Sequence, residues 1–184
     1  MLSQIWLALW FFLPGAVANA TPVFLTKWFG KKFDEPLDFH KTWRGKPIFG
    51  DHKTWRGLIG GIVMATLTLW LQIWLDQKFG WAHNLFGRIG YHHINPLILG
   101  PLFAIGALGG DAVESFVKRR IGKKAGDRWL GFDQIDYVIG GSLTTLPLVS
   151  LPWPTYIYII VLWSLISWLS SWFSYKIHLK DVPH

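Results

Sequence analysis

Long stretches without a charged side chain constrain the fold of this 184-residue chain more than any other feature. A transmembrane helix needs roughly 20 apolar residues, and inside the hydrocarbon core all of its backbone polar groups must be bonded within the protein. Charged residues make up 16% of the sequence, well below the quarter or so that is usual for soluble domains. The sequence therefore predicts an all-α, polytopic membrane protein that forms a single membrane-embedded domain over residues 1–184.

Five transmembrane helices are predicted from these stretches. The first three cover residues 1–23, 58–75 and 94–110. Residues 137–175 contain no charge and are long enough for two more helices, separated at "LPWP" (151–154), where the prolines interrupt the helical pattern. The small residues at the end of the first span resemble a signal cleavage site, but "MLSQIW" has no positive charge, so we expect a retained helix.

The positions of Lys and Arg predict how the chain is oriented. Eight of the eighteen fall within residues 21–57 and six within residues 111–134, and the C-terminal tail holds two more. Because short cytoplasmic loops carry the excess of Lys and Arg, both basic segments and the C-terminus are predicted to face the cytoplasm. The N-terminus is then outside, and the expected location is the cell (plasma) membrane.

The hexapeptide HKTWRG occurs twice, at residues 40–45 and 52–57. Each copy combines Lys and Arg with Trp and Gly, which suits either phosphate binding or contact with anionic lipid headgroups. The second copy directly precedes the second predicted span, where Gly57, Gly60 and Gly61 would let that helix approach its neighbours closely.

The second basic segment also carries regularly spaced acids. Asp111, Ser115 and Lys118 would share one face of a helix, as would Asp133 and Asp136. Acidic side chains at the mouth of a membrane span are costly, and are commonly paired or functional.

Each of these groups also has a purely structural interpretation. Asp111 and Glu114 together resemble the start of a helix, the basic run 118–124 could anchor the chain to headgroups, and Asp133 could cap a helix. Three carboxylates beside several cations nevertheless favour a site for Mg²⁺ with a polyphosphate, because Mg²⁺ takes oxygen ligands and phosphate oxygens. No Walker or Rossmann glycine motif is present in the sequence.

Three motifs carry a family resemblance: "GDHKTWRGLIGG", "GDAVESFVKRR" and "FDQIDY". In order and spacing they resemble the motifs of the membrane CTP-dependent lipid cytidylyltransferases. Within this superfamily the chain is most similar to the CDP-archaeol synthase family. Its short length, and "RWLGFDQIDYVIGG" in place of the longer bacterial signature, distinguish it from phosphatidate cytidylyltransferases.

The resemblance implies transfer of CMP from CTP to an ether-linked isoprenoid glycerol phosphate, with Mg²⁺ as cofactor and pyrophosphate as the second product. The expected partners are CTP, the anionic lipid phosphate and membrane lipids, with no nucleic acid; a homodimer is left open. Phosphatidate cytidylyltransferase activity, a CTP-dependent polyprenol kinase and a non-enzymatic lipid-binding, anion-binding or transport protein remain as alternatives. The first HKTWRG copy, with Lys41 to Arg44, is expected to form an auxiliary basic loop.

The predicted site residues fall into three groups. The residues predicted to be catalytic are Lys53, Arg56, Lys118 and Asp133. Those predicted to bind the CTP phosphates are Lys53, Thr54, Arg56, Ser115, Lys118 and Arg119. Those predicted to bind the metal are Asp111, Asp133 and Asp136.

Overall fold

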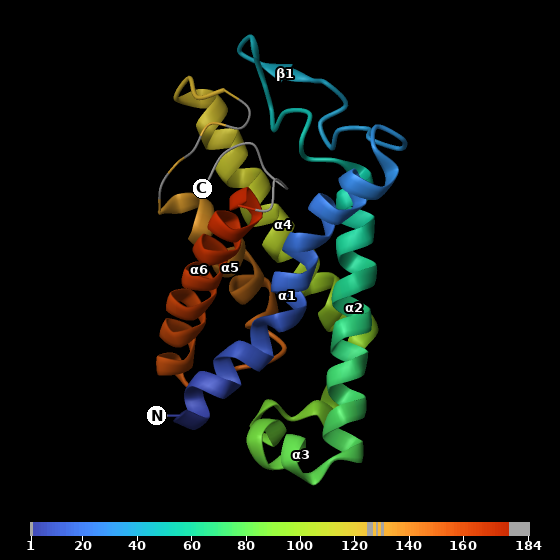
Figure 1. Cartoon of the computed structure of the whole chain (residues 1–184), viewed down its shortest axis with the longest axis vertical. Coiled ribbons are helices and arrows are strands. Elements are labelled where there is room, and N and C mark those ends of the chain that lie inside the picture. The colour runs from blue at the N-terminus through green and yellow to red at the C-terminus, as the bar shows by residue number, and fades with distance from the viewer. Residues whose placement is uncertain (1, 125–126, 128, 130, 177–184) are drawn as a thin grey trace.

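The structure, a computed structural model, describes residues 2–124, 127, 129 and 131–176. Its described part is a bundle of long helices with a small hairpin at one end (Figure 1). The predicted C-terminal tail, residues 177–184, lies outside the described residues. In chain order the elements are α1 (Leu2–Phe29), β1 (Thr42–Trp43), β2 (Lys46–Pro47), α2 (Trp55–Lys78), α3 (Gly80–Phe86), η1 (Gly87–Ile89), η2 (Tyr91–His93), α4 (Pro96–Arg120), α5 (Phe132–Thr145) and α6 (Trp153–Lys176).

Four of these helices, α1, α2, α4 and α6, are long and apolar enough to cross a membrane. The fourth predicted span corresponds to α5, which has 14 residues and is therefore about 21 Å long, shorter than a hydrocarbon core of roughly 30 Å. The predicted break between the last two spans is confirmed, since α5 ends at Thr145 and α6 begins at Trp153.

Two helices extend beyond their predicted ends. Helix α1 continues to Phe29, and α4 continues ten residues past Gly110 to Arg120. The segment from Asp111 to Arg120, predicted to lie in the second cytoplasmic segment with Asp111, Ser115 and Lys118 on one helix face, is helical and continues the third span without a break. Its charged residues are the last turns of a membrane helix, so their spacing along the helix decides which of them lie together.

Helix α4 packs against α1, α2 and α5, and aromatic rings of α1 pack on it. Phe103 of α4 and Phe12 of α1 are fully buried, and their ring centroids are 6.0 Å apart in an edge-to-face arrangement. Phe11 meets the same ring edge-to-face at 5.2 Å. Such pairs add to the stabilisation that burial of the rings provides.

Glycines allow two close helix crossings. A Cβ placed on Gly140 of α5 would lie 3.0 Å from the carbonyl carbon of Gly106, and one on Gly110 would lie 2.9 Å from that of Asp136. At the second crossing, a Cβ on Gly61 of α2 would be 3.3 Å from the main-chain oxygen of Ala18 in α1. Small residues at such positions let the backbones touch, as predicted for the start of α2.

The direction of the helices brings both basic segments to one end of the bundle. The hairpin β1–β2, the start of α2 and the end of α4 lie together there, whereas α3 lies at the opposite end (Figure 1). We call these the hairpin end and the α3 end. The hairpin end gathers the acidic and basic residues that the sequence analysis singled out.

Candidate active site

The second HKTWRG copy forms the N-terminus of α2. Thr54 is the N-cap: its backbone is extended, and its hydroxyl accepts a hydrogen bond of 3.2 Å from the Gly57 N–H. Main-chain hydrogen bonds on either side of Thr54 fix this segment. The Leu37 N–H donates to the Lys53 oxygen (2.6 Å), and the Trp55 N–H donates to the Glu35 oxygen (3.0 Å). This anchored backbone directs the Lys53 ammonium to Asp111, with 2.5 Å between Nζ and Oδ2.

The first copy of the same six residues forms a β-hairpin. Thr42 and Trp43 pair with Pro47 and Lys46, and the two-residue turn between the strands, Arg44–Gly45, has positive φ angles of 52° and 73°. Positive φ at both positions is typical of a type I′ hairpin turn. The two copies differ because Pro47 opposes helical continuation of the first, whereas an apolar run follows the second.

The hairpin docks on the end of α4 through aromatic and cationic side chains. Trp43 stacks on Phe116, with ring centroids 5.5 Å apart, and the Arg120 guanidinium lies 5.3 Å from the Trp43 ring centroid. Arg120 also donates to the main-chain oxygens of Trp43, Lys46 and Pro47. The first copy thus uses its Trp for packing, and neither Phe116 nor Arg120 was predicted to take part.

A buried carboxylate closes the loop that carries this hairpin. The Asp38 side chain accepts hydrogen bonds from the main-chain N–H groups of His40 (3.1 Å), Phe49 (2.8 Å) and Gly50 (3.0 Å). Burial by itself would raise the pKa of Asp38, but these three donors lower it below its ordinary value. Asp38 therefore joins the two ends of the hairpin loop immediately before the Lys53 segment.

Arg56 has partners different from those expected of a phosphate ligand. Its guanidinium pairs with Asp34 at 2.8 Å and donates to the main-chain oxygens of Gly30 (2.9 Å) and Lys32 (2.5 Å) and to the Thr26 hydroxyl (3.1 Å). These contacts fasten the start of α2 to the end of α1. The predicted role of Arg56 on CTP remains a prediction, while its structural role is plain.

Three carboxylates meet where α4 and α5 cross. Asp111 and Glu114 of α4 and Asp136 of α5 each offer one oxygen, and these oxygens lie within 4.8 Å of one another. The crossing at Gly110 makes this possible, because it lets the α4 backbone touch the Asp136 main chain. Clustered carboxylate oxygens are the ligands that Mg²⁺ prefers, so this cluster suits the predicted cofactor.

Glu114 is the cluster member that was not predicted from the sequence. Reading Asp111 and Glu114 as a helix start is wrong, because α4 begins at Pro96. The signal was present in the spacing: Glu114 is three residues after Asp111 and four before Lys118, which places all three on one face of a helix. Only 8% of the Glu114 surface is exposed.

Lys118 joins this cluster to Asp133. Its Nζ lies 2.5 Å from Asp133 Oδ1 and 2.8 Å from Glu114 Oε1, and the residue is 7% exposed. Asp133 also accepts a 2.9 Å hydrogen bond from the Trp129 N–H. The predicted metal ligand Asp133 is therefore held against a lysine at the edge of the three-carboxylate cluster.

The remaining predicted residues lie on the same helix. Ser115 and Arg119 are buried one turn apart in α4, with Arg119 Nε 3.5 Å from the Ser115 main-chain oxygen. The structure thus brings together Lys53, Asp111, Lys118, Asp133 and Asp136, and adds Glu114.

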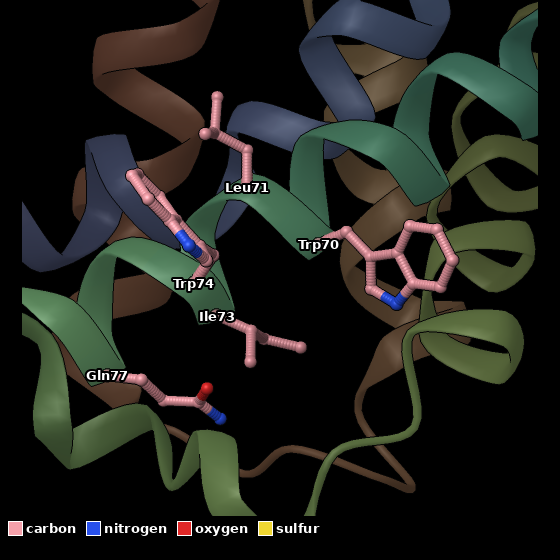
Figure 2. A pocket seen from close by; sticks show the side chains of 5 residues that line it. All are labelled: Trp70, Leu71, Ile73, Trp74 and Gln77. Atoms are coloured by element: carbon pink, nitrogen blue, oxygen red, sulfur yellow. The ribbon is translucent and has the colours of Figure 1, made fainter.

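A surface hollow elsewhere on the molecule has a different character. It has a volume of about 480 Å³ and is lined by α2 side chains only, Trp70, Leu71, Ile73, Trp74 and Gln77 (Figure 2). None of these side chains is ionisable, and two of them are half-exposed indoles. This face of α2 suits contact with lipid, and the ionic chemistry lies at the hairpin end.

Comparison with known proteins gives a consistent set of relatives. A family model described as CarS-like, CDP-archaeol synthase, matches residues 1–184. The CDP-archaeol synthase of Thermococcus onnurineus (strain NA1) is 35% identical over 183 residues, covering 99% of this chain and 98% of that protein. That of Methanosphaerula palustris is 37% identical over 155 residues, covering 80% of this chain and 89% of that protein. A solved structure titled "Structural insight into an intramembrane enzyme for archaeal membrane lipids biosynthesis" has a TM-score of 0.68 and 25% identity, covering 89% of this chain and 91% of that one.

Proposed function

The chain belongs to the CDP-archaeol synthase family, and on this premise we propose that it transfers CMP from CTP to an ether-linked isoprenoid glycerol phosphate in archaeal-type lipid synthesis. The products are a CDP-lipid and pyrophosphate. One observation supports this function best: lysines and carboxylates suited to a metal and a polyphosphate converge at one end of a bundle of apolar helices. A water-soluble nucleotide and a membrane-anchored phosphate can meet at such a place.

The reaction needs positioning and charge stabilisation more than it needs a strong base. The attacking lipid phosphate oxygen is already anionic, and it forms a bond to the α-phosphorus of CTP as the bond to pyrophosphate breaks. Lys53 and Lys118 are held by Asp111 and by Asp133, respectively, so in our proposal they reach the phosphates from fixed positions. Fixed cations stabilise the charge that develops in the transition state and need no reorganisation at that moment.

We assign Mg²⁺ to Asp111, Glu114 and Asp136, with Asp133 as the neighbouring carboxylate predicted from the sequence. The donor set fits, since it consists of carboxylate oxygens gathered within 4.8 Å for the first three. When bound there, Mg²⁺ would neutralise phosphate charge and orient the leaving pyrophosphate. In this proposal Ser115, Arg119 and Thr54 bind the CTP phosphates, as the sequence predicted, and Arg56 acts by fixing the start of α2.

We also propose the orientation in the membrane. The chain crosses five times, with α5 and the segment after it forming the fourth crossing, and the hairpin end faces the cytoplasm of a plasma membrane. The two basic segments lie together at that end, as the bias of cytoplasmic loops toward Lys and Arg requires (Figure 1). Cysteine labelling from each side of intact cells tests the orientation, and light scattering of the solubilised protein tests the homodimer.

The function is tested by measuring pyrophosphate release from CTP by the purified protein with Mg²⁺ and an ether-linked lipid phosphate. Release that requires the lipid is expected, and Asp133→Asn should abolish it. Asp51→Asn is the matched control, because the Asp51 side chain is 80% exposed and pairs only with His40 in the described structure. Release of CDP instead would identify a lipid kinase, a preference for ester-linked lipid would identify a phosphatidate cytidylyltransferase, and no release with either lipid would refute transfer.

A further inference from the structure

Two of the three carboxylates in the cluster at the α4–α5 crossing pair with lysines. Asp111 pairs with Lys53 at 2.5 Å, and Glu114 pairs with Lys118 at 2.8 Å. The carboxylates are those to which we assign Mg²⁺, and the lysines are those to which we assign the CTP phosphates. The groups proposed to bind the metal and the groups proposed to bind the phosphates are thus each other's partners.

The two lysines differ in what they would lose if a metal took their partner. Lys118 also pairs with Asp133 at 2.5 Å, so it stays paired when Glu114 binds a metal. For the Lys53 ammonium, Asp111 is the one ion-pair partner within the described residues. A metal on Asp111 would leave this ammonium unpaired beside a divalent charge, and like charges at such short range repel strongly. Lys53 is therefore the lysine that opposes metal binding.

Lys53 can change its partner without movement of the backbone. Its main chain is fixed, because the Lys53 oxygen accepts a hydrogen bond from the Leu37 N–H. Its side chain is 20% exposed, so a phosphate can approach the ammonium from solvent. Lysine carries its charge on a flexible four-carbon stem with three rotatable donors. The ammonium can thus move from Asp111 to a phosphate oxygen while the start of α2 stays in place.

We propose that Lys53 makes metal binding depend on CTP, an inference that rests on the proposed nucleotidyl transfer. The ammonium competes with Mg²⁺ for Asp111. The CTP phosphates take the ammonium and so free the carboxylate for Mg²⁺. Because coupling between two ligands is reciprocal, Mg²⁺ raises the affinity for CTP by the same factor. Either ligand alone leaves one member of the Lys53–Asp111 pair without a partner, whereas the two together give each member a new one.

Metal binding without nucleotide tests this inference. The probe is Mn²⁺, which takes carboxylate oxygens as Mg²⁺ does, titrated into the purified protein while electron paramagnetic resonance measures the free ion. Lys53→Met should tighten Mn²⁺ binding by about tenfold or more, within the usual range for coupled sites. Lys53→Gln should tighten it too, because this side chain is neutral yet can still donate to Asp111. Unchanged or weaker binding by both variants would overturn the proposal, and weaker binding would mean that Lys53 only positions Asp111.

Two control variants separate a direct contact from a general effect of charge. Lys41 occupies the same place in the first HKTWRG copy and is exposed, so Lys41→Met should bind Mn²⁺ as wild type does. Lys53→Arg keeps a positive charge beside Asp111 and should bind Mn²⁺ as weakly as wild type. The gain in Lys53→Met should persist in about 0.5 M KCl, because a partly buried pair is screened much less than exposed charges. A gain that Lys41→Met shares, or that disappears in salt, would overturn the proposal.

The second measurement is the affinity for CTP without lipid, by titration calorimetry in excess Mg²⁺ or in EDTA. Mg²⁺ should raise this affinity more in wild type than in Lys53→Met, which lacks the ammonium that couples the two ligands. An equal rise in the two proteins, in a wild type that releases pyrophosphate with lipid, would overturn this inference and leave the proposed function standing. No binding of CTP by wild type in Mg²⁺ would refute the site assignment and this inference together.

Discussion

Replacing Gly110 with alanine should separate the two halves of the proposed metal site. The new Cβ would lie 2.9 Å from the carbonyl carbon of Asp136, whereas carbon atoms in contact are about 3.5–4.0 Å apart. Helix α5 must therefore withdraw from α4 by roughly 0.6–1.1 Å, the difference between these distances. Asp136 moves with it, away from Asp111 and Glu114.

The effects on stability and on activity should differ in size. Overpacking of this kind costs about 1–3 kcal/mol, and the better helix propensity of alanine offsets about 1 kcal/mol of it, so the fold should survive. A displacement of about 1 Å at a catalytic site can cost about 10²-fold in rate. We expect Gly110→Ala to lower kcat for pyrophosphate release by about 10- to 100-fold and to raise the Mg²⁺ concentration needed for half-maximal rate.

Gly109→Ala is the matched control for this experiment. Gly109 precedes Gly110 in α4, and a Cβ added there would have no neighbour within 4 Å among the described atoms. This variant should keep wild-type activity and gain up to about 1 kcal/mol of stability. If Gly110→Ala is folded and as active as Gly109→Ala, then the close crossing does not position the carboxylates, and the reasoning is refuted.

Three further predictions concern other residues of the hairpin end. Lys53→Ala should abolish turnover and Lys41→Ala should only weaken it, as measured by initial rates at saturating CTP; equal losses would remove the distinction between the two HKTWRG copies. Glu114→Gln should raise the Mg²⁺ requirement in an activity titration at least tenfold, and an unchanged requirement would take Glu114 out of the metal site. Asp38→Asn should lower Tm at neutral pH. The pKa of Asp38 is lower in the folded than in the unfolded protein, so its carboxylate stabilises the fold at pH values above the unfolded-state pKa of about 3.9. This contribution is lost as the pH falls through the folded-state pKa. The Tm difference from wild type should therefore shrink on acidification, and a constant difference would contradict this account.

The apolar runs predicted the long helices well, because crossing a membrane leaves a chain few alternatives. The positions at which helices end were predicted less well from uncharged runs, because a helix that leaves the membrane can continue into polar surroundings. Helix α4 does so from Asp111 to Arg120, and the error mattered because it hid Glu114 behind a capping interpretation. The same helical spacing that placed Asp111 and Lys118 on one face would have found Glu114, had it been applied to that residue as well.

The two HKTWRG copies mark the limit of local sequence in this chain. Identical residues form a hairpin in one place and a helix start in the other, because their neighbours and tertiary contacts differ. Stacking of Trp43 on Phe116 joins residues 73 positions apart, and the four donations of Arg56 reach back to the end of α1. Spacing within a motif could not reveal either set of partners.

The length of α4 has a consequence for how substrate is encountered. Its 25 residues span about 37 Å, some 7 Å more than a hydrocarbon core, so in the proposed orientation its carboxylates and Lys118 lie at the level of lipid headgroups. A lipid phosphate can then react while its isoprenoid chains stay in the bilayer, which avoids a cost of about 0.8 kcal/mol for each CH₂ withdrawn. The search for this substrate becomes two-dimensional. The rate should therefore follow the mole fraction of lipid phosphate in the membrane, and diluting the membrane with inert lipid should slow the reaction even when the amount of substrate per volume of solution is constant.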